Sequence, residues 1–275
     1  MDSGADIQDR DLEGPPTVDS TPYNWLGLWA LYMREVRRFM KVYTQTLVAP
    51  VVTTLLFLAI FTLALGRAVE AVGGVPFKEF LAPGLIMMAI IQNSFANTSS
   101  SISIAKSQGN IVDTLMTPLN AHELTFAMAM GGATRGVLVA IATAVAMSFF
   151  VPVHVHHLGF AVYHAISAAL MLSLLGTIGG IWADKFDHLA AVTNFVIMPL
   201  SFLSGTFYSI QRLPEIFQAI AHANPFFYMI DGFRYGFIGH ADGSLAASVL
   251  VTAGVNGGLW LLCHWMFKSG YKLKS

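Results

Sequence analysis

Long apolar runs alternate with short polar interruptions from residue 45 to the end of the chain. Six of these runs approach or exceed about 20 mostly apolar residues, enough for a helix to cross a bilayer core of about 30 Å. The predicted spans cover residues 45–66, 80–104, 123–150, 158–183, 189–208 and 244–267. The pattern therefore predicts an all-α, polytopic membrane protein with six transmembrane helices.

The composition supports this fold class. Of the 275 residues, 55% are hydrophobic and 11% are charged, whereas about a quarter of the residues in a soluble domain are charged. The formal net charge of −1 gives no reason to expect a nucleic-acid partner. Cys263 is the one cysteine in the sequence, so an internal disulfide is excluded.

The chain begins with two segments that precede the first span. Residues 1–22 are acidic and poor in apolar side chains, so we expect a disordered cytoplasmic tail. Residues 23–44 repeat apolar side chains at helical spacing and predict an amphipathic interfacial helix. Its polar side carries Arg34, Arg37, Arg38 and Lys41. The helix is either a membrane anchor alone or also a contact for a cytoplasmic partner.

The second span carries an unusual polar stripe. Asn93, Asn97 and Ser101 recur at a spacing of four residues and share one helix face, and Gln92 lies beside them. Polar groups avoid lipid, so this face is expected to point at another helix or at a water-filled path. Hydrogen bonds between helices and the lining of a substrate path both remain open.

A polar loop, residues 105–122, separates the second and third spans. It contains Gln108, Asn110, Asp113 and Thr114. We predict that it holds a short helix, about residues 110–116, along the membrane surface. In the third span, Arg135 is expected near the cytoplasmic end, where a cation snorkels or pairs.

Residues 209–243 are too polar to span and predict a re-entrant pair of outer helices. The first covers about residues 214–223, and the second begins at Pro225 with Asn224 as its cap. Asp231 and Arg234 are three residues apart on the second helix, so we expect them to pair.

Three histidines lie in the outer turn between the third and fourth spans, namely His154, His156 and His157. Neither a carboxylate nor a cysteine joins them nearby, so we expect solvated histidines and no metal site.

The distribution of cations predicts the orientation. With both termini inside, eleven of the 15 Lys and Arg residues lie on the inner side, and Arg67, Lys78, Arg212 and Arg234 lie outside. This asymmetry favours cytoplasmic termini.

Motifs for several enzymes are missing from the sequence. It has no GxxxxGK[ST] loop for phosphates. His122 and Glu123 begin an HExxH pattern, but Phe126 stands at the second histidine position. Ser204-Gly205 resembles an intramembrane serine protease only faintly, because Phe202 replaces the expected glycine. An ion-coupled secondary transporter is the main alternative, although the spans lack an internal repeat and have few charges.

Several stretches resemble the ABC-2 type transporter permeases, most closely their YadH-like branch. In chain order they are FMKVYTQTLVAPVVT, FLAPGLIMMAII, GNIVDTLMTP, FLSGTFYSIQRLP and ANPFFYMIDGFRYGFIG. The last is the most specific, with Asn-Pro followed nine residues after the proline by arginine. The resemblance covers residues 23–275.

This resemblance implies the permease subunit of an exporter in the bacterial inner membrane. Two such subunits, a homodimer by default, would pair above two separate ATP-binding subunits that hold ATP and Mg²⁺, while this chain binds no cofactor. Lipids, lipid-linked glycans or hydrophobic drugs would be exported.

The resemblance also implies roles for individual residues. Contact with the ATPase would involve Arg34, Arg37, Arg38, Gln108, Asn110, Asp113 and Thr114. The substrate path would follow the second and fifth spans, with Gln92, Asn93, Asn97 and Asn194. An outer gate would contain Asn224, Pro225, Asp231 and Arg234.

Overall fold

The computed structural model describes residues 23–66, 69–72 and 74–273. The predicted N-terminal tail, residues 1–22, lies outside them. Six helical segments are long and apolar enough to cross a membrane, and they confirm the all-α, six-span architecture. They cover Thr44–Ala64, Phe77–Ser107, Ala121–Ser148, Leu158–Trp182, Phe186–Leu203 and Leu245–Ser269.

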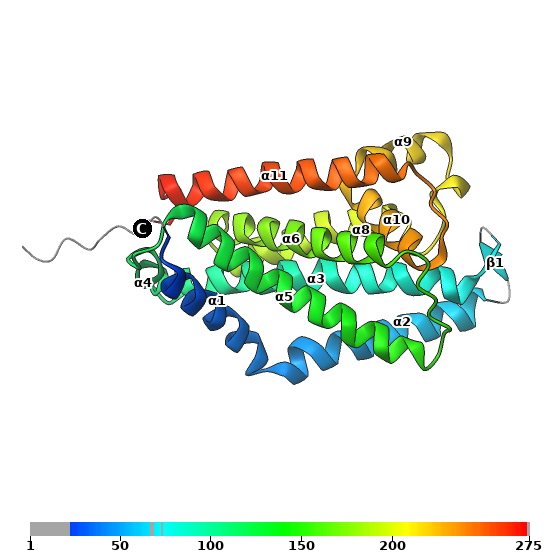
Figure 1. The fold of residues 1–275 in the computed structure, drawn as a ribbon, viewed down its shortest axis with the longest axis horizontal. Helices are drawn as coiled ribbons and strands as arrows, with labels where there is room; N and C mark the ends of the chain where they lie inside the picture. The colour runs from blue at the N-terminus through cyan, green and yellow to red at the C-terminus, as the bar shows by residue number, and fades with distance from the viewer. Residues whose placement is uncertain (1–22, 67–68, 73, 274–275) are drawn as a thin grey trace, which may run out of the picture.

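The long helices form a bundle and run roughly along the long axis of the molecule (Figure 1). The helices of the first half are α1 (Trp25–Met40), η1 (Thr44–Val48), α2 (Ala49–Leu65), α3 (Phe77–Ser107), α4 (Ile111–Leu115) and α5 (Ala121–Ser148). Those of the second half are α6 (Leu158–Trp182), α7 (Phe186–Val192), η2 (Thr193–Ile197), α8 (Met198–Leu203), η3 (Ile210–Arg212), α9 (Glu215–Ala223), α10 (Pro225–Ile238) and α11 (Leu245–Ser269).

Two opposite ends of the bundle are distinct. The start of α1, the short helix α4 and the C-terminal residues share one end, called here the α4 end (Figure 1). The other, the α10 end, carries α9, α10 and a small antiparallel hairpin of β1 (Ala71–Val72) and β2 (Val75–Pro76). The hairpin falls in the predicted loop between the first two spans.

Helix α3 forms the centre of the fold. It packs against α2, α5, α6 and α10. In its most apolar stretch of 18 residues, 83% of the residues are buried, whereas the corresponding share is 11% in the first span and 17% in both the fifth and the sixth. Small residues allow the close contact of α3 and α6, because a side chain at Gly176 would collide with Thr98 and with the backbone oxygen of Phe95. The first, fifth and sixth spans therefore form the outside of the bundle.

Two prolines distort spans in the same way. Pro50 follows the π-helix η1, and Pro199 follows the π-helix η2. Proline has no N–H to donate to the carbonyl four residues earlier, and a wider turn with bonds to the fifth residue accommodates that loss. Each of the two prolines thus lies directly after a π-helical turn.

The fifth span ends earlier than the predicted residue 208. Helix α8 stops at Leu203, and Gly205 adopts a positive φ of 78°. A glycine reaches this left-handed conformation without steric cost. The chain therefore turns back at Ser204 and leads through η3 into α9.

Candidate functional site

A groove at the α4 end lies between α1, the end of α3 and the loop that contains α4. Its volume is about 480 Å³. Six of the seven residues predicted to contact an ATPase are on its wall: Arg34, Arg37, Arg38, Gln108, Asn110 and Thr114. Asp113 is exposed on α4 and does not line the groove. Residues distant in sequence thus form one basic, polar surface.

Glu35 organises the charges of this groove. Its side chain is only 1% exposed and accepts hydrogen bonds from Arg34 Nη2 at 3.3 Å, from Arg38 Nε at 3.2 Å and from Ser101 Oγ at 2.7 Å. A buried carboxylate needs such partners, because leaving water costs several kcal/mol. The sequence prediction missed Glu35, although it is the only acidic residue within the basic run of this helix.

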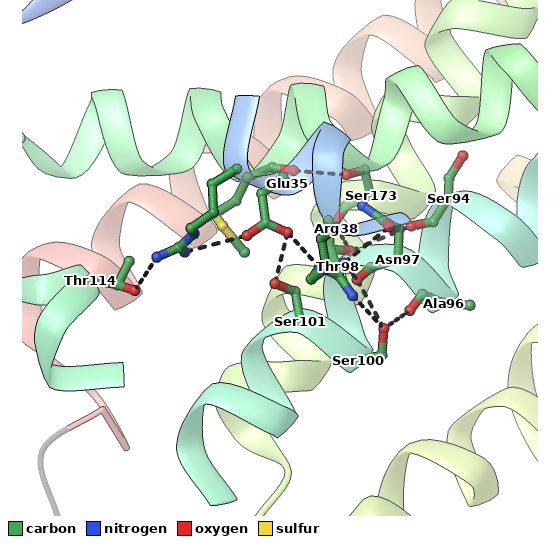
Figure 2. A network of polar contacts seen from close by, with 12 residues as sticks. Glu35, Arg38, Ser94, Ala96, Asn97, Thr98, Ser100, Ser101, Thr114 and Ser173 are labelled. Atoms are coloured by element: carbon green, nitrogen blue, oxygen red, sulfur yellow. Dashed lines mark hydrogen bonds and ion pairs between the residues drawn. The ribbon is translucent and has the colours of Figure 1, made fainter. Parts of the chain in front are cut away.

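The contacts of Glu35 extend in both directions (Figure 2). Arg34 Nη1 donates to Thr114 Oγ1 on α4 at 3.1 Å. Arg38 Nη2 donates to the backbone oxygen and to Oδ1 of Asn97 on α3, at 2.6 and 3.0 Å. A continuous series of polar contacts, Thr114–Arg34–Glu35–Arg38–Asn97, therefore connects α4 through α1 to α3. We call these five residues the polar relay.

Hydrogen bonds of Glu123 fasten the start of α1 to the same region. This buried carboxylate accepts the backbone N–H of Asn24 at 2.5 Å and that of Asn120 at 2.6 Å. The second bond belongs to a capping box that starts α5. Asn24 also donates from Nδ2 to the oxygen of Pro118 at 3.2 Å. Helix α1 is thus attached at its N-cap residue, Asn24, as well as through the polar relay.

A second pocket, of about 370 Å³, lies farther along the bundle between α2, α3 and the fifth span. Gln92 and Asn93 line it, together with apolar residues such as Phe57, Leu85 and Met88. We call it the central pocket. Asn97 is fully buried against Arg38, and Asn194 is exposed outside the pocket lining. Two of the four predicted path residues therefore share this pocket, and Asn97 instead makes the interhelical contact of the alternative interpretation.

The position predicted for Arg135 is wrong. This residue is the fifteenth of the 28 in α5, so it lies halfway along the helix rather than near one end. Its Nη2 donates to Asn93 Oδ1 on α3 at 2.9 Å, so the side chain points into the bundle and does not snorkel to the surface.

At the α10 end, Asn224 behaves as the predicted cap. Its Oδ1 accepts the backbone N–H of Phe226 at 3.1 Å, and Pro225 occupies the first turn of α10. Its Nδ2 also donates to the oxygen of Leu200 at 2.9 Å and to Ser204 Oγ at 2.7 Å. Asn224 thereby joins α10 to the end of the fifth span.

The predicted ion pair of Asp231 with Arg234 is wrong. Asp231 accepts the backbone N–H groups of Asp242 and Gly243, at 2.8 and 2.9 Å. Arg234 is 1% exposed, donates to the oxygen of Gly205 at 2.5 Å and lies 4.1 Å from the centroid of the Phe80 ring. Asp231 binds the loop that follows α10, and Arg234 binds the turn at Gly205 that precedes α9. The two side chains therefore face different segments.

The histidine turn packs on α10. The ring of His157 stacks on Tyr235 with centroids 5.4 Å apart, and its backbone N–H donates to the oxygen of Gly236 at 2.8 Å. His156 lies edge-on to His157. It also lines, together with His154, a pocket of about 330 Å³. Within the described ranges, no group of three or more His, Cys, Asp or Glu side chains is arranged to hold a metal ion.

Sequence comparisons identify related proteins. The ABC-2 type transporter family matches residues 27–238. The inner membrane transport permease YadH of Escherichia coli is 38% identical over 251 residues, which cover 91% of this chain and 98% of that protein. Nodulation protein J of Sinorhizobium fredii is 24% identical, over 84% of this chain and 88% of its own length. The same-named protein of Rhizobium leguminosarum bv. trifolii is 25% identical, over 79% and 82%.

Proposed function

Since this chain belongs to the ABC-2 type transporter family of membrane permeases, we propose that it is the permease subunit of an ATP-driven exporter. The family comprises multi-pass inner-membrane transport components that are not ATPases themselves and normally work with an ATP-binding subunit. Here, two copies of this chain pair, and two ATP-binding subunits supply ATP and Mg²⁺. Both termini and the α4 end face the cytoplasm, and the α10 end faces outward.

The polar relay is the observation that carries this proposal. A short helix at the end of the bundle can transmit force only if it is connected to the spans that must move. Thr114 is bound to Arg34, and Arg38 is bound to Asn97 on α3. Helix α3 also carries Gln92 and Asn93 on the wall of the central pocket. Movement of α4 by the ATPases would therefore reach that wall through α1.

The exposed first and fifth spans support pairing of two permeases. Both flank the central pocket, and large apolar side chains such as Leu63 and Phe195 are about four-fifths exposed, at 79% and 81%. In a membrane such surfaces contact lipid or another helix. We assign this face to the second copy, so that the two central pockets lie beside the path of a hydrophobic or amphipathic cargo.

The first experiment is a mild-detergent purification of the tagged chain, followed by mass spectrometry and an ATPase assay. We expect an ATP-binding subunit to co-purify with vanadate-sensitive activity. Purification of the permease alone, together with proton- or sodium-dependent flux in vesicles, would instead establish a secondary transporter.

Substitutions in α4 test the coupling role. In the reconstituted complex, Asp113→Trp and Thr114→Trp should retain ATP hydrolysis but lose ATP-driven movement of a fluorescent lipid analogue out of the inner leaflet. Phe149→Trp is the control, because Phe149 is 82% exposed at the end of α5, at the opposite end of the bundle. Lipid movement at the wild-type rate in both test variants would refute the coupling assignment.

A further inference from the structure

We propose that Arg135, acting through Asn93, forms a recognition site for the anionic group of an amphipathic cargo, a phosphate or carboxylate, in the central pocket. This inference rests on the proposed transport function and specifies, in addition, that the cargo carries a negative charge. It begins from a cation that no carboxylate of the described residues contacts.

Among the residues that the structure describes, no carboxylate lies within 4.0 Å of the Arg135 guanidinium. Its one hydrogen bond goes to the neutral amide oxygen of Asn93 at 2.9 Å. Its Nε is buried and has no hydrogen-bond partner within the described ranges. An arginine side chain stays protonated inside a protein, so the middle of α5 retains a positive charge.

Two other arginines of the bundle, half-buried Arg38 and buried Arg234, are neutralised or stabilised locally. Arg38 pairs with Glu35 at 3.2 Å. Arg234 lies over the ring of Phe80 and binds a backbone oxygen. A cation inside a membrane span is expensive and commonly marks a functional position, with its partner inside the bundle or in a water-filled cavity. Arg38 and Arg234 thus have local partners, whereas within the described ranges the Arg135 guanidinium hydrogen-bonds only to the neutral amide oxygen of Asn93.

Asn93 connects this charge to the central pocket. Its Oδ1 accepts from Arg135, and its Nδ2 donates to the backbone oxygen of Ala89 at 2.9 Å. An amide nitrogen carries two hydrogens, so one N–H remains on a side chain that lines the pocket. The bond from a cation to Oδ1 polarises the amide and strengthens that donor. The pocket wall thus presents a donor with a positive charge behind it.

The rest of the pocket suits the apolar part of an amphiphile. Phe57, Leu85 and Met88 line it. Gln92 and Gln45 add neutral polar groups to its wall. A volume of about 370 Å³ falls within the range of small-molecule sites. An acidic head group with a hydrocarbon chain therefore fits this lining better than a small free anion does.

Equilibrium binding to the permease tests the inference, because it requires neither ATP nor knowledge of the natural cargo. The purified full chain is placed in phosphatidylcholine nanodiscs, together with its ATPase when one co-purifies. Oleoyl lysophosphatidic acid is the anionic probe, and oleoyl lysophosphatidylcholine, with the same chain, is the zwitterionic reference. Native mass spectrometry counts bound probe, and a titration gives the two dissociation constants.

We expect wild-type permease to prefer the anionic probe by about tenfold, the effect of one charge interaction at a partly buried site. Arg135→Gln should remove this preference, and Arg135→Lys should keep most of it. Asn93→Asp should also remove it, because the new carboxylate neutralises Arg135 without opening a cavity. Lys185→Gln is the matched control for loss of a positive charge, since exposed Lys185 lies outside the lining of the central pocket, and it should leave the preference intact.

Inorganic phosphate distinguishes the two sources of the anion. Ten millimolar phosphate should not displace the lipid probe, because it cannot use the apolar lining. Displacement would overturn the assignment to an amphiphile. Equal binding of both probes to wild type, or a preference that survives both Arg135→Gln and Asn93→Asp, would overturn the site. Either result would leave an observed vanadate-sensitive complex, and hence the exporter assignment, unaffected.

Discussion

Arg38 and Asn97 are joined by two hydrogen bonds from a single guanidinium nitrogen, one to the backbone oxygen and one to the side-chain oxygen of Asn97. This contact fixes the end of α1 against the most buried helix of the fold. Glu35 holds the same guanidinium from the other side at 3.2 Å. The orientation of α1 on α3 therefore depends on one carboxylate, and the first prediction concerns that carboxylate.

Glu35→Gln should weaken the contact between α1 and α3 while preserving the shape of the side chain. The amide removes the negative charge between Arg34 and Arg38, and we expect a loss of about 1–3 kcal/mol in the free energy of unfolding. Thermal unfolding of the purified permease measures the loss, and ATP-driven lipid movement should fall with it. Arg37→Gln, on the same helix, is the control for the melting temperature alone, because Arg37 belongs to the surface assigned to the ATPase. An unchanged melting temperature for Glu35→Gln would contradict the central role of this carboxylate.

Lys106 closes the C-terminal end of α6. Its Nζ donates to the backbone oxygens of Ile181 and Ala183 at 2.7 and 2.8 Å, which helix geometry leaves without partners. Lys106→Met should cost about 1–3 kcal/mol in the free energy of unfolding, because these bonds involve a charged donor. Amide hydrogen exchange should speed up at residues 179–184. Exposed Lys185, at the next turn, provides the control Lys185→Met, and equal effects of the two substitutions would contradict the capping role.

The sequence predicted the fold class and the number of spans because apolar length is a local property. The short helix α4, residues 111–115, lies inside the predicted range of 110–116. The cap at Asn224 also followed from neighbouring residues, since Asn-Pro is a local helix-start signal. Such features need no knowledge of which helices touch.

Pairings between distant helices were not predictable in the same way. The spacing of Asp231 and Arg234 suggested a pair, but the loop at residues 242–243 and the turn at Gly205 bind them separately. Glu35 was overlooked because its partner Ser101 is 66 positions away. Arg135 was expected to reach the membrane surface, because the sequence does not reveal that Asn93 on α3 faces this arginine inside the bundle. Tertiary contacts determine the partners of these side chains, and the periodicity of the sequence carries no information about such contacts.

The substitution Asn224→Asp distinguishes two roles of this side chain: capping α10 and hydrogen-bonding to the end of the fifth span. An aspartate still accepts the N–H of Phe226, but it loses the two donors to Leu200 and Ser204. We expect α10 to persist and amide exchange at residues 203–209 to accelerate. About 1–3 kcal/mol should be lost, because two hydrogen bonds disappear and a carboxylate oxygen then faces the backbone oxygen of Leu200. Circular dichroism and hydrogen exchange measure the two effects. Ser244→Ala, which removes a cap of α11, controls for loss of a helix cap at the same end.

Gly176 and Gly179 provide a matched pair for the packing of α6 on α3. A methyl group at Gly176 would collide with Thr98 Oγ1 and with the backbone oxygen of Phe95, whereas at Gly179 its nearest neighbour would be 3.4 Å away. Gly176→Ala should therefore destabilise the permease by about 1–3 kcal/mol through overpacking. Gly179→Ala should be neutral, or stabilising by up to about 1 kcal/mol, because alanine favours the helix. Both changes add one methyl group to the same helix, so a difference in melting temperature reports contact with α3 alone. Equal melting temperatures for the two variants would show that α6 can move away from α3 and that the centre of the bundle is not tightly packed.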